Sequence, residues 1–504
     1  MRGQVPRIIH QGPLRAYVKP LPDPPDLLAV AHALPSSMPV VWLDSGRPHP
    51  VTGRWSLLGY DPWLTLRVRG DHAQLHTSAA THAWRAHPLE ALRRILRRYA
   101  APADAQPHGR AIGLMGFLSY ELSRWIEPRT QRLGAGPRAM EQPLDDMVWF
   151  GMRVVVLVDH LQGRGWLVSV LDPHMPEASA RQDARVALEQ AQRLWTAARQ
   201  SGSSPGRFQG PHGAAGYGRA AVEATSSQPA FEAMVTKTLE HIRAGDIFQA
   251  NVSQRFSTAW ERPPLPLYTA LRRINPSPFA CYCSTGDLAV VSCSPERLVR
   301  VQEGRIDTRP IAGTRPRGAT PADDAVNSLE LLLSEKERAE HLMLVDLARN
   351  DLGRVCATGS VSVTELMALE EYSHVIHIVS NVSGLLRGGV EAADIIRAVF
   401  PGGTVTGCPK VRCMQLLTEL EPVARGLYTG SLGYLGFDGT LDLNIAIRTM
   451  VLQGQQLSFH VGAGIVADSD PEREYHETLA KAGALMRALH AVDEEASFSH
   501  AAAG

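Results

Sequence analysis

The sequence predicts an α+β fold built from mainly antiparallel strands that are flanked by helices. Strand-like runs and helical stretches follow one another without the regular strand–helix–strand alternation that a parallel sheet requires. Strands are predicted over residues 57–69, 152–158 and 166–170, and helices over 88–99 and 180–199. The pair Asp438-Gly439 between two further strand-like runs is typical of a tight hairpin, which joins antiparallel neighbours.

The chain changes character after residue 200. Residues 201–229 are rich in Gly, Ser, Pro and Ala and carry almost no apolar periodicity, which is typical of a linker. A chain of 504 residues is long enough for two or more domain-sized units. We therefore expect an N-terminal region over 1–200, a linker over 201–229, a second domain over 230–490 and a flexible tail over 491–504.

Regular structure is predicted again directly after the linker. Apolar residues recur at helical spacing over 231–242, and Gly245 suits the end of that helix. Residues 247–256 then alternate, so that Gln249 and Asn251 fall on one polar face of a strand. A polar face of this composition predicts that the strand lines a pocket. Further strands are predicted over 444–451 and 456–461.

Composition argues against several classes of partner. Lys and Arg together number 51, as do Asp and Glu, so no net charge attracts nucleic acid or a membrane surface. The 6 cysteines form no CxxC pair, which favours a reducing compartment over a zinc site or a disulfide framework. No window approaches the roughly 18 apolar residues of a membrane span, and the start lacks a signal-peptide core. We expect a cytoplasmic protein without a nucleic-acid or membrane partner.

Two predicted helices each carry a pair of glutamates spaced three residues apart. Glu337 and Glu340 form one pair, and Glu474 and Glu477 form the other. This spacing places both carboxylates of a pair on one helix face. A pair of this kind is usually part of a solvated surface. Carboxylate and water oxygens also suit Mg²⁺, however, which typically bridges to an anionic substrate.

Glu296 is a candidate general acid. It stands in Ser294-Pro-Glu-Arg297, just after an apolar strand predicted over 288–292. Burial or neighbouring negative charge would keep its carboxyl protonated, as proton donation requires. The alternative is a salt bridge to Arg297 at the end of the strand, which would leave Glu296 ionised.

A glycine-rich motif covers residues 400–410, which read Phe-Pro-Gly-Gly-Thr-Val-Thr-Gly-Cys-Pro-Lys. It fails the phosphate-binding loop pattern because Cys408-Pro409 follows Gly407. Pro409 instead suits the first position of a helix over 410–421, whose free N–H groups offer an anion site. Lys410 either adds to that anion site or is a surface charge of the first turn.

Three further features in the C-terminal half bear on ligand binding. Arg448 lies near the end of a predicted strand, where a guanidinium can bind a carboxylate through two parallel hydrogen bonds. The glycines of Gly462-Ala-Gly464 would let backbone N–H groups approach a ligand closely. A lone histidine on an apolar strand, such as His377, is more often a core residue than a ligand contact.

Four motifs together carry a resemblance to a known family. They are Thr308-Arg-Pro-Ile-Ala-Gly-Thr-Arg-Pro-Arg-Gly318, Ser294-Pro-Glu-Arg297, the 400–410 motif and Gly462-Ala-Gly-Ile-Val-Ala-Asp-Ser469. In combination they resemble the chorismate-utilising enzymes, densely over residues 228–490 and loosely before them. Within that family the chain is similar to the large, aminating subunit, component I, of aminodeoxychorismate synthase or of anthranilate synthase.

The resemblance implies a fold and a metal site. The fold is the chorismate-binding, anthranilate synthase component I-like fold, in which two packed, mainly antiparallel β-sheets are flanked by helices. In this family, glutamates that match Glu340 and Glu477 hold Mg²⁺ against a carboxylate of chorismate. Their partners Glu337 and Glu474 would lie nearby.

The resemblance also implies the residues around the substrate. Glu296 would protonate the departing C4 hydroxyl, Thr404 and His377 would lie at the reacting ring, and Ala312 occupies the position of a lysine found in part of the family. The other implied substrate contacts are Gln249, Gly313, Thr314, Lys410, Tyr434, Arg448, Gly462, Gly464 and Lys481.

The branches of the family differ in what adds to the chorismate ring. Isochorismate-forming members carry a lysine base where Gln249 stands, so we discount that branch. Aminodeoxychorismate synthases typically carry a lysine that attacks ring carbon C2 where Ala312 stands, whereas anthranilate synthases carry alanine there. Ala312 therefore favours anthranilate, while Asn251, Arg297 and Gly402-Gly403 look like the aminodeoxychorismate branch.

On these markers we favour aminodeoxychorismate synthase, which aminates chorismate at C4 for p-aminobenzoate and folate synthesis. The alternative is anthranilate synthase, which aminates C2, releases pyruvate and serves tryptophan synthesis. A third hypothesis is a non-catalytic chorismate-binding subunit. Since the cysteines lack a Gly-x-Cys-x-Gly elbow, either synthase would take ammonia from a separate glutamine amidotransferase subunit.

Overall fold

The computed structural model describes residues 6–501 apart from positions 22, 25, 48, 50–51, 103–106, 131–143, 201–221, 319 and 372–374. Most of the predicted linker and the last three residues of the predicted tail lie outside the described residues. The predicted boundary between residues 490 and 491 falls within the last helix, α11 (Pro471–Ala501).

Strands and helices alternate irregularly along the chain, as predicted. The N-terminal elements are β1 (Arg7–Gln11), β2 (Leu14–Leu21), α1 (Leu27–His32), β3 (Val40–Asp44), β4 (Trp55–Arg69), β5 (His72–Thr77), β6 (Thr81–Arg85), α2 (Pro88–Arg98), β7 (Gly113–Leu118), α3 (Ser123–Ile126), β8 (Met147–Asp159), β9 (Arg164–Val170) and α4 (Glu177–Gln200). The short 3₁₀ turns η1 (Pro107–Ala111), η2 (Tyr120–Leu122) and η3 (Pro128–Thr130) fall among them. The strands predicted in this half correspond to β4, β8 and β9, and the helices to α2 and α4.

The C-terminal half carries the motifs singled out above. Its strands are β10 (Glu223–Ala224), β11 (Gln249–Ala259), β12 (Phe279–Ser284), β13 (Leu288–Ser294), β14 (Arg297–Gln302), β15 (Arg305–Thr308), β16 (Ile311–Pro316), β17 (Ser362–Glu371), β18 (Val375–Leu385), β19 (Gly407–Cys408), β20 (Ser431–Gly436), β21 (Leu441–Asn444), β22 (Thr449–Gln453) and β23 (Gln456–Ile465). Its helices are α5 (Gln228–Arg243), α6 (Pro264–Ile274), α7 (Pro321–Leu333), α8 (Glu335–Gly353), α9 (Ala392–Val399), the 3₁₀ turn η4 (Gly403–Val405), α10 (Lys410–Leu420) and α11. The predicted hairpin at Asp438-Gly439 joins β20 to β21.

The strand pairings between described strands are antiparallel, which confirms the predicted sheet type. These pairings connect the 23 described strands into one continuous sheet that folds over on itself. N-terminal strands take part in this sheet alongside C-terminal ones, because β3 pairs with β12 and β7 pairs with β20. The two expected sheet layers are therefore joined through shared strand pairs.

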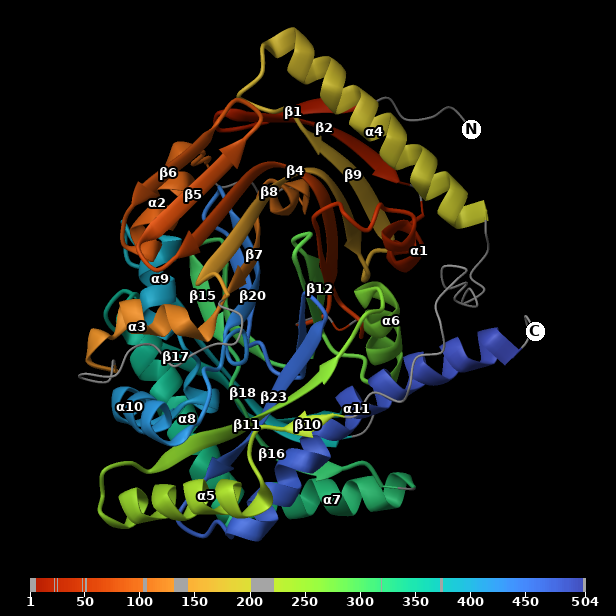
Figure 1. Cartoon of the computed structure of the whole chain (residues 1–504). Helices are drawn as coiled ribbons and strands as arrows, with labels where there is room; N and C mark the ends of the chain where they lie inside the picture. The colour runs from red at the N-terminus through yellow and green to blue at the C-terminus, as the bar shows by residue number, and fades with distance from the viewer. Residues whose placement is uncertain are drawn as a thin grey trace.

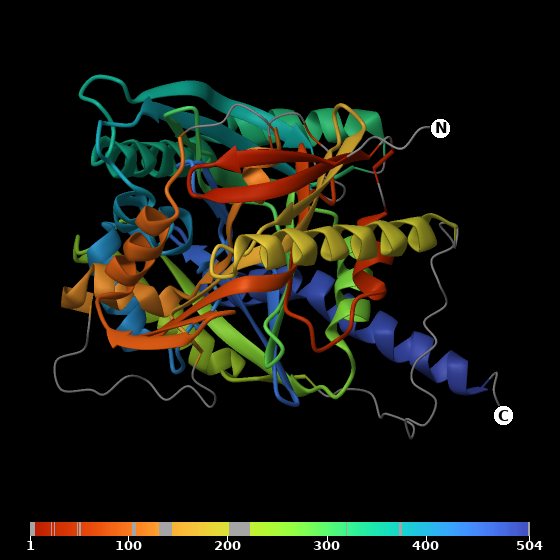
Figure 2. The same cartoon turned by 90° about the horizontal axis from the view of Figure 1, so that it is seen from above.

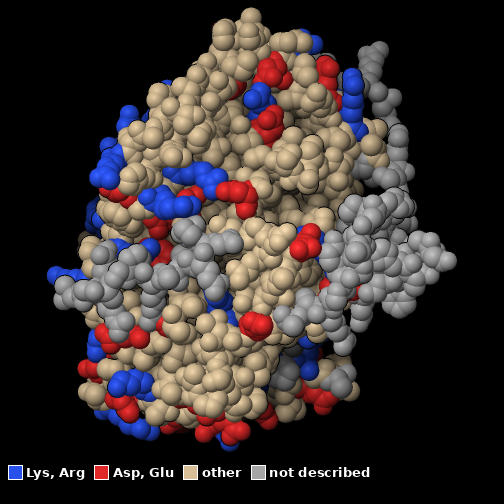
Figure 3. Space-filling model, in the orientation of Figure 1, with Lys and Arg blue, Asp and Glu red and all other residues tan. Residues whose placement is uncertain are grey.

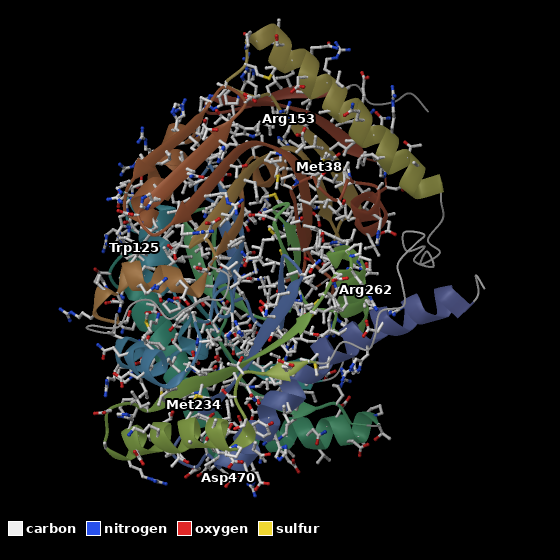
Figure 4. The ribbon with its side chains drawn as sticks, in the orientation of Figure 1. Met38, Trp125, Arg153, Met234, Arg262 and Asp470 are labelled. Carbon is white, nitrogen blue, oxygen red and sulfur yellow. The ribbon has the colours of Figure 1, made fainter. Side chains whose placement is uncertain are left out.

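Apolar side chains from both halves of the chain form common cores. Trp149 and Leu443 lie in one buried cluster, and Trp42 and Phe459 lie in another. Helices cover the outside of the sheet: α4 lies over β2 and β9 at one end of the molecule, whereas α5 and α7 lie at the opposite end, from which α11 runs along the side of the molecule past α6 (Figures 1 and 2). Met234 of α5 and Asp470, just before α11, mark this second end in Figure 4.

Arg448 does not lie in a strand, contrary to the prediction of a strand over 444–451. β21 ends at Asn444, and β22 begins at Thr449. Between them the chain is irregular, and Arg448 adopts a positive φ of 51°. Such a backbone conformation is uncommon for a residue other than glycine and is concentrated at functional sites. The Arg448 carbonyl nevertheless accepts a hydrogen bond from the Cys293 N–H of β13 over 3.2 Å, so Arg448 lies just before the start of β22.

The visible charges are dispersed, as the balanced composition predicts. On the face seen in Figure 3, basic and acidic side chains are interspersed among other residues. None of the helices in the described part of the chain is long and apolar enough to cross a membrane.

Candidate active site

Glu296 lies in the turn between β13 and β14, and only 5% of it is exposed. Thr404 in η4 donates a hydrogen bond from Oγ1 to Glu296 Oε1 over 2.7 Å. Burial raises the pKa of this carboxyl to about 7, against the opposing effects of the Thr404 hydroxyl, the Ile311 backbone N–H and the Arg448 charge. Glu296 therefore keeps a proton up to neutral pH, as a general acid must.

His377 on β18 is buried and electrically neutral. Its Nδ1 lies 3.3 Å from the carbonyl oxygen of Gly313, and because a carbonyl can only accept, Nδ1 carries the proton. Burial, helped by the positive charge of Arg448, lowers the pKa of His377 to about 4. Arg448 acts electrostatically on both His377 and Glu296, so its charge lies within range of both side chains.

An irregularity in the pairing of β16 with β18 depends on a glycine. Gly313 has a φ of +69°, and a Cβ there would lie only 3.0 Å from Glu337 Oε2. Ala312 precedes it and pairs with Ile378 of β18. The backbone of Thr314 pairs with His377, but the Thr314 side chain lies outside the described residues, so its predicted contact stays a prediction.

The two predicted glutamate pairs come together from α8 and α11. Burial, together with the negative charges of Glu337, Glu474 and Glu477, raises the pKa of Glu340 to about 7. The carboxylates of Glu337, Glu474 and Glu477 therefore lie within electrostatic range of Glu340. Lys481, one turn beyond Glu477 on α11, binds Glu477 Oε1 through its Nζ over 2.7 Å.

This carboxylate cluster fits a divalent cation. Glu474 Oε2 is buried, and within the described residues it has no hydrogen-bond partner. No three Asp, Glu, His or Cys side chains of the described residues are grouped closely enough to hold an ion alone. Mg²⁺, however, usually takes one or two carboxylates and completes its shell with waters and substrate oxygens. Glu340 and Glu477 would hold such an ion, with Glu337 and Glu474 around it.

The polar face predicted for β11 does line the site. A Cβ at Gly464 would lie 2.9 Å from Gln249 Nε2, and one at Gly462 would lie 2.5 Å from Asn251 Oδ1. Both glycines stand opposite β11 on β23, so the absence of side chains there makes room for the two amides. Lys481 donates from Nζ to the Gly462 carbonyl over 3.0 Å, which connects this face to the carboxylate cluster.

Tyr434 is placed elsewhere, which corrects the prediction that it contacts the substrate. It lines a separate cavity of about 150 Å³ together with Leu43, Ser45 and Arg297. The tyrosine at the site is Tyr428, whose hydroxyl would lie 2.7 Å from a Cβ at Gly462. Sequence reasoning missed Tyr428 because it lies in an irregular segment before β20, where no periodicity indicates which way a side chain points.

Lys410 is also corrected. Its Nζ donates to Asp351 Oδ2 over 2.5 Å and to the Val399 carbonyl over 3.2 Å, and its side chain is largely buried. The Lys410 ammonium group therefore forms an ion pair inside the protein, between α8 and the first turn of α10, and does not face a ligand. Asp351 and Glu296 both line a small cavity of about 30 Å³.

The site therefore combines a protonated carboxyl, a neutral imidazole, a guanidinium and a cluster of carboxylates. The predicted residues that it gathers are Gln249, Glu296, Ala312, Gly313, Glu337, Glu340, His377, Thr404, Arg448, Gly462, Gly464, Glu474, Glu477 and Lys481. A buried acid opposite cationic groups and a candidate metal site suits a reaction in which an anionic substrate loses a hydroxyl group.

Comparison with known proteins identifies the family. Residues 42–487 match the family model described as chorismate binding enzyme. The chain is 40% identical over 443 residues to aminodeoxychorismate synthase component 1 of Bacillus subtilis, covering 88% of this chain and 91% of the relative. It is 40% identical over 462 residues to anthranilate synthase component 1 of Synechocystis, covering 87% and 88%.

A solved structure supports the fold assignment. Anthranilate synthase component I from Streptococcus pneumoniae superposes with a TM-score of 0.73 at 31% identity, covering 87% of this chain and 94% of that one. The chorismate-binding fold implied by the sequence motifs is thus confirmed. On the family match and these relatives together, the chain belongs to the family of chorismate binding enzymes.

Proposed function

We propose that this chain is component I of an aminodeoxychorismate synthase, which aminates chorismate at C4 to give 4-amino-4-deoxychorismate. The observation that carries amination of chorismate is the buried Glu296, which is bound by Thr404, has a pKa raised to about 7 and lies within electrostatic range of Arg448. The choice of C4 is supported by the similarity to the Bacillus subtilis synthase and by Asn251, whose amide faces Gly462 in the site.

Each side chain has a definite task in this reaction. Glu296 donates its proton to the C4 hydroxyl oxygen as the C4–O bond breaks, so that water rather than hydroxide leaves. Arg448 supplies a positive charge beside the substrate, and His377, held through Gly313, stays neutral. Bound Mg²⁺, held by Glu340 and Glu477, would fix and neutralise a substrate carboxylate. Since Ala312 cannot attack C2, water or ammonia bonds to C2 as the C4–O bond breaks, and it leaves C2 again, with the ring double bonds shifting back, when ammonia bonds to C4.

Anthranilate synthesis is the second candidate, and Ala312 favours it. Its methyl group leaves C2 open, so ammonia could add there and stay, after which pyruvate would be lost. Glu296 would serve this reaction equally well, because both routes begin with departure of the C4 hydroxyl. The similarity to anthranilate synthase from Synechocystis is as high as that to the aminodeoxychorismate synthase.

Product analysis decides between the two. The purified chain would be incubated with chorismate, Mg²⁺ and ammonium, with and without an added aminodeoxychorismate lyase. We expect p-aminobenzoate only when the lyase is present, because C4 amination leaves the side chain attached. Anthranilate and pyruvate without the lyase would show that Ala312 decides the reaction and that the proposal is wrong.

Ala312→Lys is expected to trap the substrate. The new amine would form a bond to C2 while the C4–O bond breaks and Glu296 protonates the leaving oxygen, so the protein mass should rise by that of chorismate less water. Intact-protein mass spectrometry checks this. Ala312→Met, which has similar length and no amine, is the control and should form no adduct. A folded Ala312→Lys variant with neither adduct nor turnover would contradict the assumed placement of the ring.

We further propose that ammonia reaches this chain from a separate glutamine amidotransferase subunit. All six cysteines lie within the described residues, and burial raises the pKa of each thiol. A glutaminase nucleophile needs the opposite, a lowered pKa and an accessible thiolate. The cysteines of this chain are therefore poorly suited to release ammonia from glutamine.

A further inference from the structure

Lys410 and Asp351 form a buried ion pair that the mechanism described above does not use. Their side chains are 10% and 7% exposed. Burial raises the pKa of Asp351 even against the opposing charge of Lys410, so keeping this carboxylate ionised costs stability. The second carboxylate oxygen of Asp351, Oδ1, is buried and has no hydrogen-bond partner within the described residues. A pair that contributes so little to stability calls for a further role.

Lys410 holds together the two ends of the segment that carries Thr404. Residues 400–409 follow α9, which ends at Val399, and precede α10, which begins at Lys410. Because the Lys410 ammonium group donates to the Val399 carbonyl, it closes this segment into a loop. Because it also binds Asp351, it ties the closed loop to α8. Thr404 lies near the middle of the loop, in η4.

α8 also supports the middle of this loop. A Cβ at Gly403 would lie 2.2 Å from Leu347 Cδ2, so the leucine packs directly on the backbone that precedes Thr404. Leu347 and Asp351 are four residues apart on α8 and therefore share one helix face. The loop thus contacts this face both in η4 and at its C-terminal end.

The loop in turn places a hydroxyl group on the general acid. Thr404 Oγ1 donates to Glu296 Oε1 over 2.7 Å, and both residues line the cavity of about 30 Å³ that Asp351 also lines. The charged side chains around Glu296 are Arg448, whose charge acts on it, and Arg297 and Asp351, which line the same cavity. The ion pair and the acid are therefore close neighbours.

We propose that Lys410 and Asp351 are positioning residues for the general acid. They hold the 400–409 loop on α8, so that the Thr404 hydroxyl stays within hydrogen-bonding distance of the Glu296 carboxyl. That hydrogen bond favours the ionised carboxylate and so lowers the pKa of Glu296 against the effect of burial. This inference rests on the proposed function only through the role of Glu296 as the acid, which is the same for amination at C4 and at C2.

A charge-neutral double substitution tests this role. Asp351→Asn with Lys410→Met removes one negative and one positive charge, so no buried charge is left unpaired. With ammonium as the nitrogen source, we expect kcat to fall about 10–100-fold, since a displacement of about 1 Å can cost that much. The KM for chorismate should not change.

The pH profile gives a readout that a general structural defect would not move. In the parent chain, kcat/KM should fall as the pH rises through the pKa of Glu296, about 7. In the double variant this alkaline limb should lie at higher pH, because Glu296 loses the hydrogen bond from Thr404. The variant carries the same net charge as the parent, so a change in overall charge cannot produce the shift.

Thr404→Val gives the reference, because it removes the same hydrogen bond directly. If the ion pair acts through Thr404, adding Thr404→Val to the double variant should lower kcat little further, whereas a fully additive loss would overturn the proposal. Lys410→Arg, which can still donate to Asp351, should keep the alkaline limb of the parent. Lys237→Met on α5 and Asp346→Asn on α8 alter exposed members of other ion pairs and should resemble the parent chain.

An unmoved alkaline limb in the folded double variant would overturn the proposal, whatever the loss of rate. A rise in the KM for chorismate at unchanged kcat would also overturn it and place Lys410 at the substrate. If the parent chain has no alkaline limb, or if Glu296→Gln leaves the rate unchanged, the proposed acid itself fails, and this inference with it. Should the double variant not fold, Asp351→Leu with Lys410→Met replaces the pair by apolar groups, a change that buried ion pairs often tolerate. An unmoved limb there would contradict the proposal equally.

Discussion

Replacing Glu296 with glutamine is expected to lower kcat by about 10²–10⁴-fold, the usual contribution of a positioned general acid. Glutamine has the same shape and can still accept the hydrogen bond from Thr404, but it cannot release a proton to the leaving oxygen. Chorismate binding should change little. Steady-state rates with ammonium as the nitrogen source, together with a chorismate binding titration, check both parts.

The pH dependence of kcat/KM gives a second test of the role of Glu296. Because the pKa of Glu296 is raised to about 7, the acid form dominates below pH 7 and is lost as the pH rises through that value. In the free enzyme, kcat/KM should therefore fall on the alkaline side of about 7. The residual activity of Glu296→Gln should lack this limb. A limb that persists in the variant would assign the titration to another group.

Unfolding cannot explain the loss, because the substitution should stabilise the protein at alkaline pH. A folded-state pKa above the unfolded value means that stability falls as the pH rises through the folded pKa. The rise in the pKa of Glu296 from 4.5 to about 7 corresponds to a loss of about 3 kcal/mol of stability at pH values well above 7, at 1.36 kcal/mol per pKa unit. Glutamine carries no such penalty. A Glu296→Gln variant that melts well below the parent at pH 8 would contradict the buried, protonated carboxyl.

Replacing Glu340 with glutamine is expected to raise the Mg²⁺ concentration for half-maximal activity by at least about 10–100-fold, the range measured even for groups that only support a metal ligand. The negative charges of Glu337, Glu474 and Glu477 all act on this residue. Rates measured over a Mg²⁺ series at saturating chorismate check the expectation. Glu335→Gln, at an exposed position on the same helix, should behave like the parent chain.

This effect should also depend on pH. Without the ion, burial and neighbouring charge raise the pKa of Glu340 to about 7, but Mg²⁺ binds the ionised carboxylate. The parent chain should therefore bind Mg²⁺ more weakly as the pH falls below about 7, with protons released on binding. Glu340→Gln should lose most of this dependence. Equal Mg²⁺ requirements in the parent and the variant would show that Glu340 on α8 does not hold the metal ion.

The spacing of residues along the sequence predicted more of the site than the backbone conformation expected for each segment did. The two glutamate pairs could be predicted because residues three or four positions apart share one face of a helix, and both pairs do lie on helices, α8 and α11. Gln249 and Asn251 were visible because strand residues alternate between faces, as they do on β11. That α8 and α11 meet could not be read from spacing, since only the tertiary fold brings them together.

The corrected residues share a physical cause. Lys410 is held by Asp351 of α8, a partner 59 positions away that no local pattern reveals. Arg448 sits in a short irregular segment with positive φ, although its sequence surroundings resemble a strand. Tyr428 and Tyr434 are six residues apart, and the change from irregular chain to β20 sends them to different cavities. In each case tertiary context overrides the local signal.

The shared strand pairs have a consequence for biosynthesis. β3 can form its pairing with β12 only after β12 has been synthesised, and β7 can pair with β20 only after β20 has been synthesised. At about 5–20 residues per second, the ribosome delivers each late partner tens of seconds after the early strand. Nascent chains would expose unpaired strand edges throughout that interval, which invites aggregation. A fragment beginning after the linker would keep such edges permanently, so the C-terminal half is a poor candidate for expression on its own.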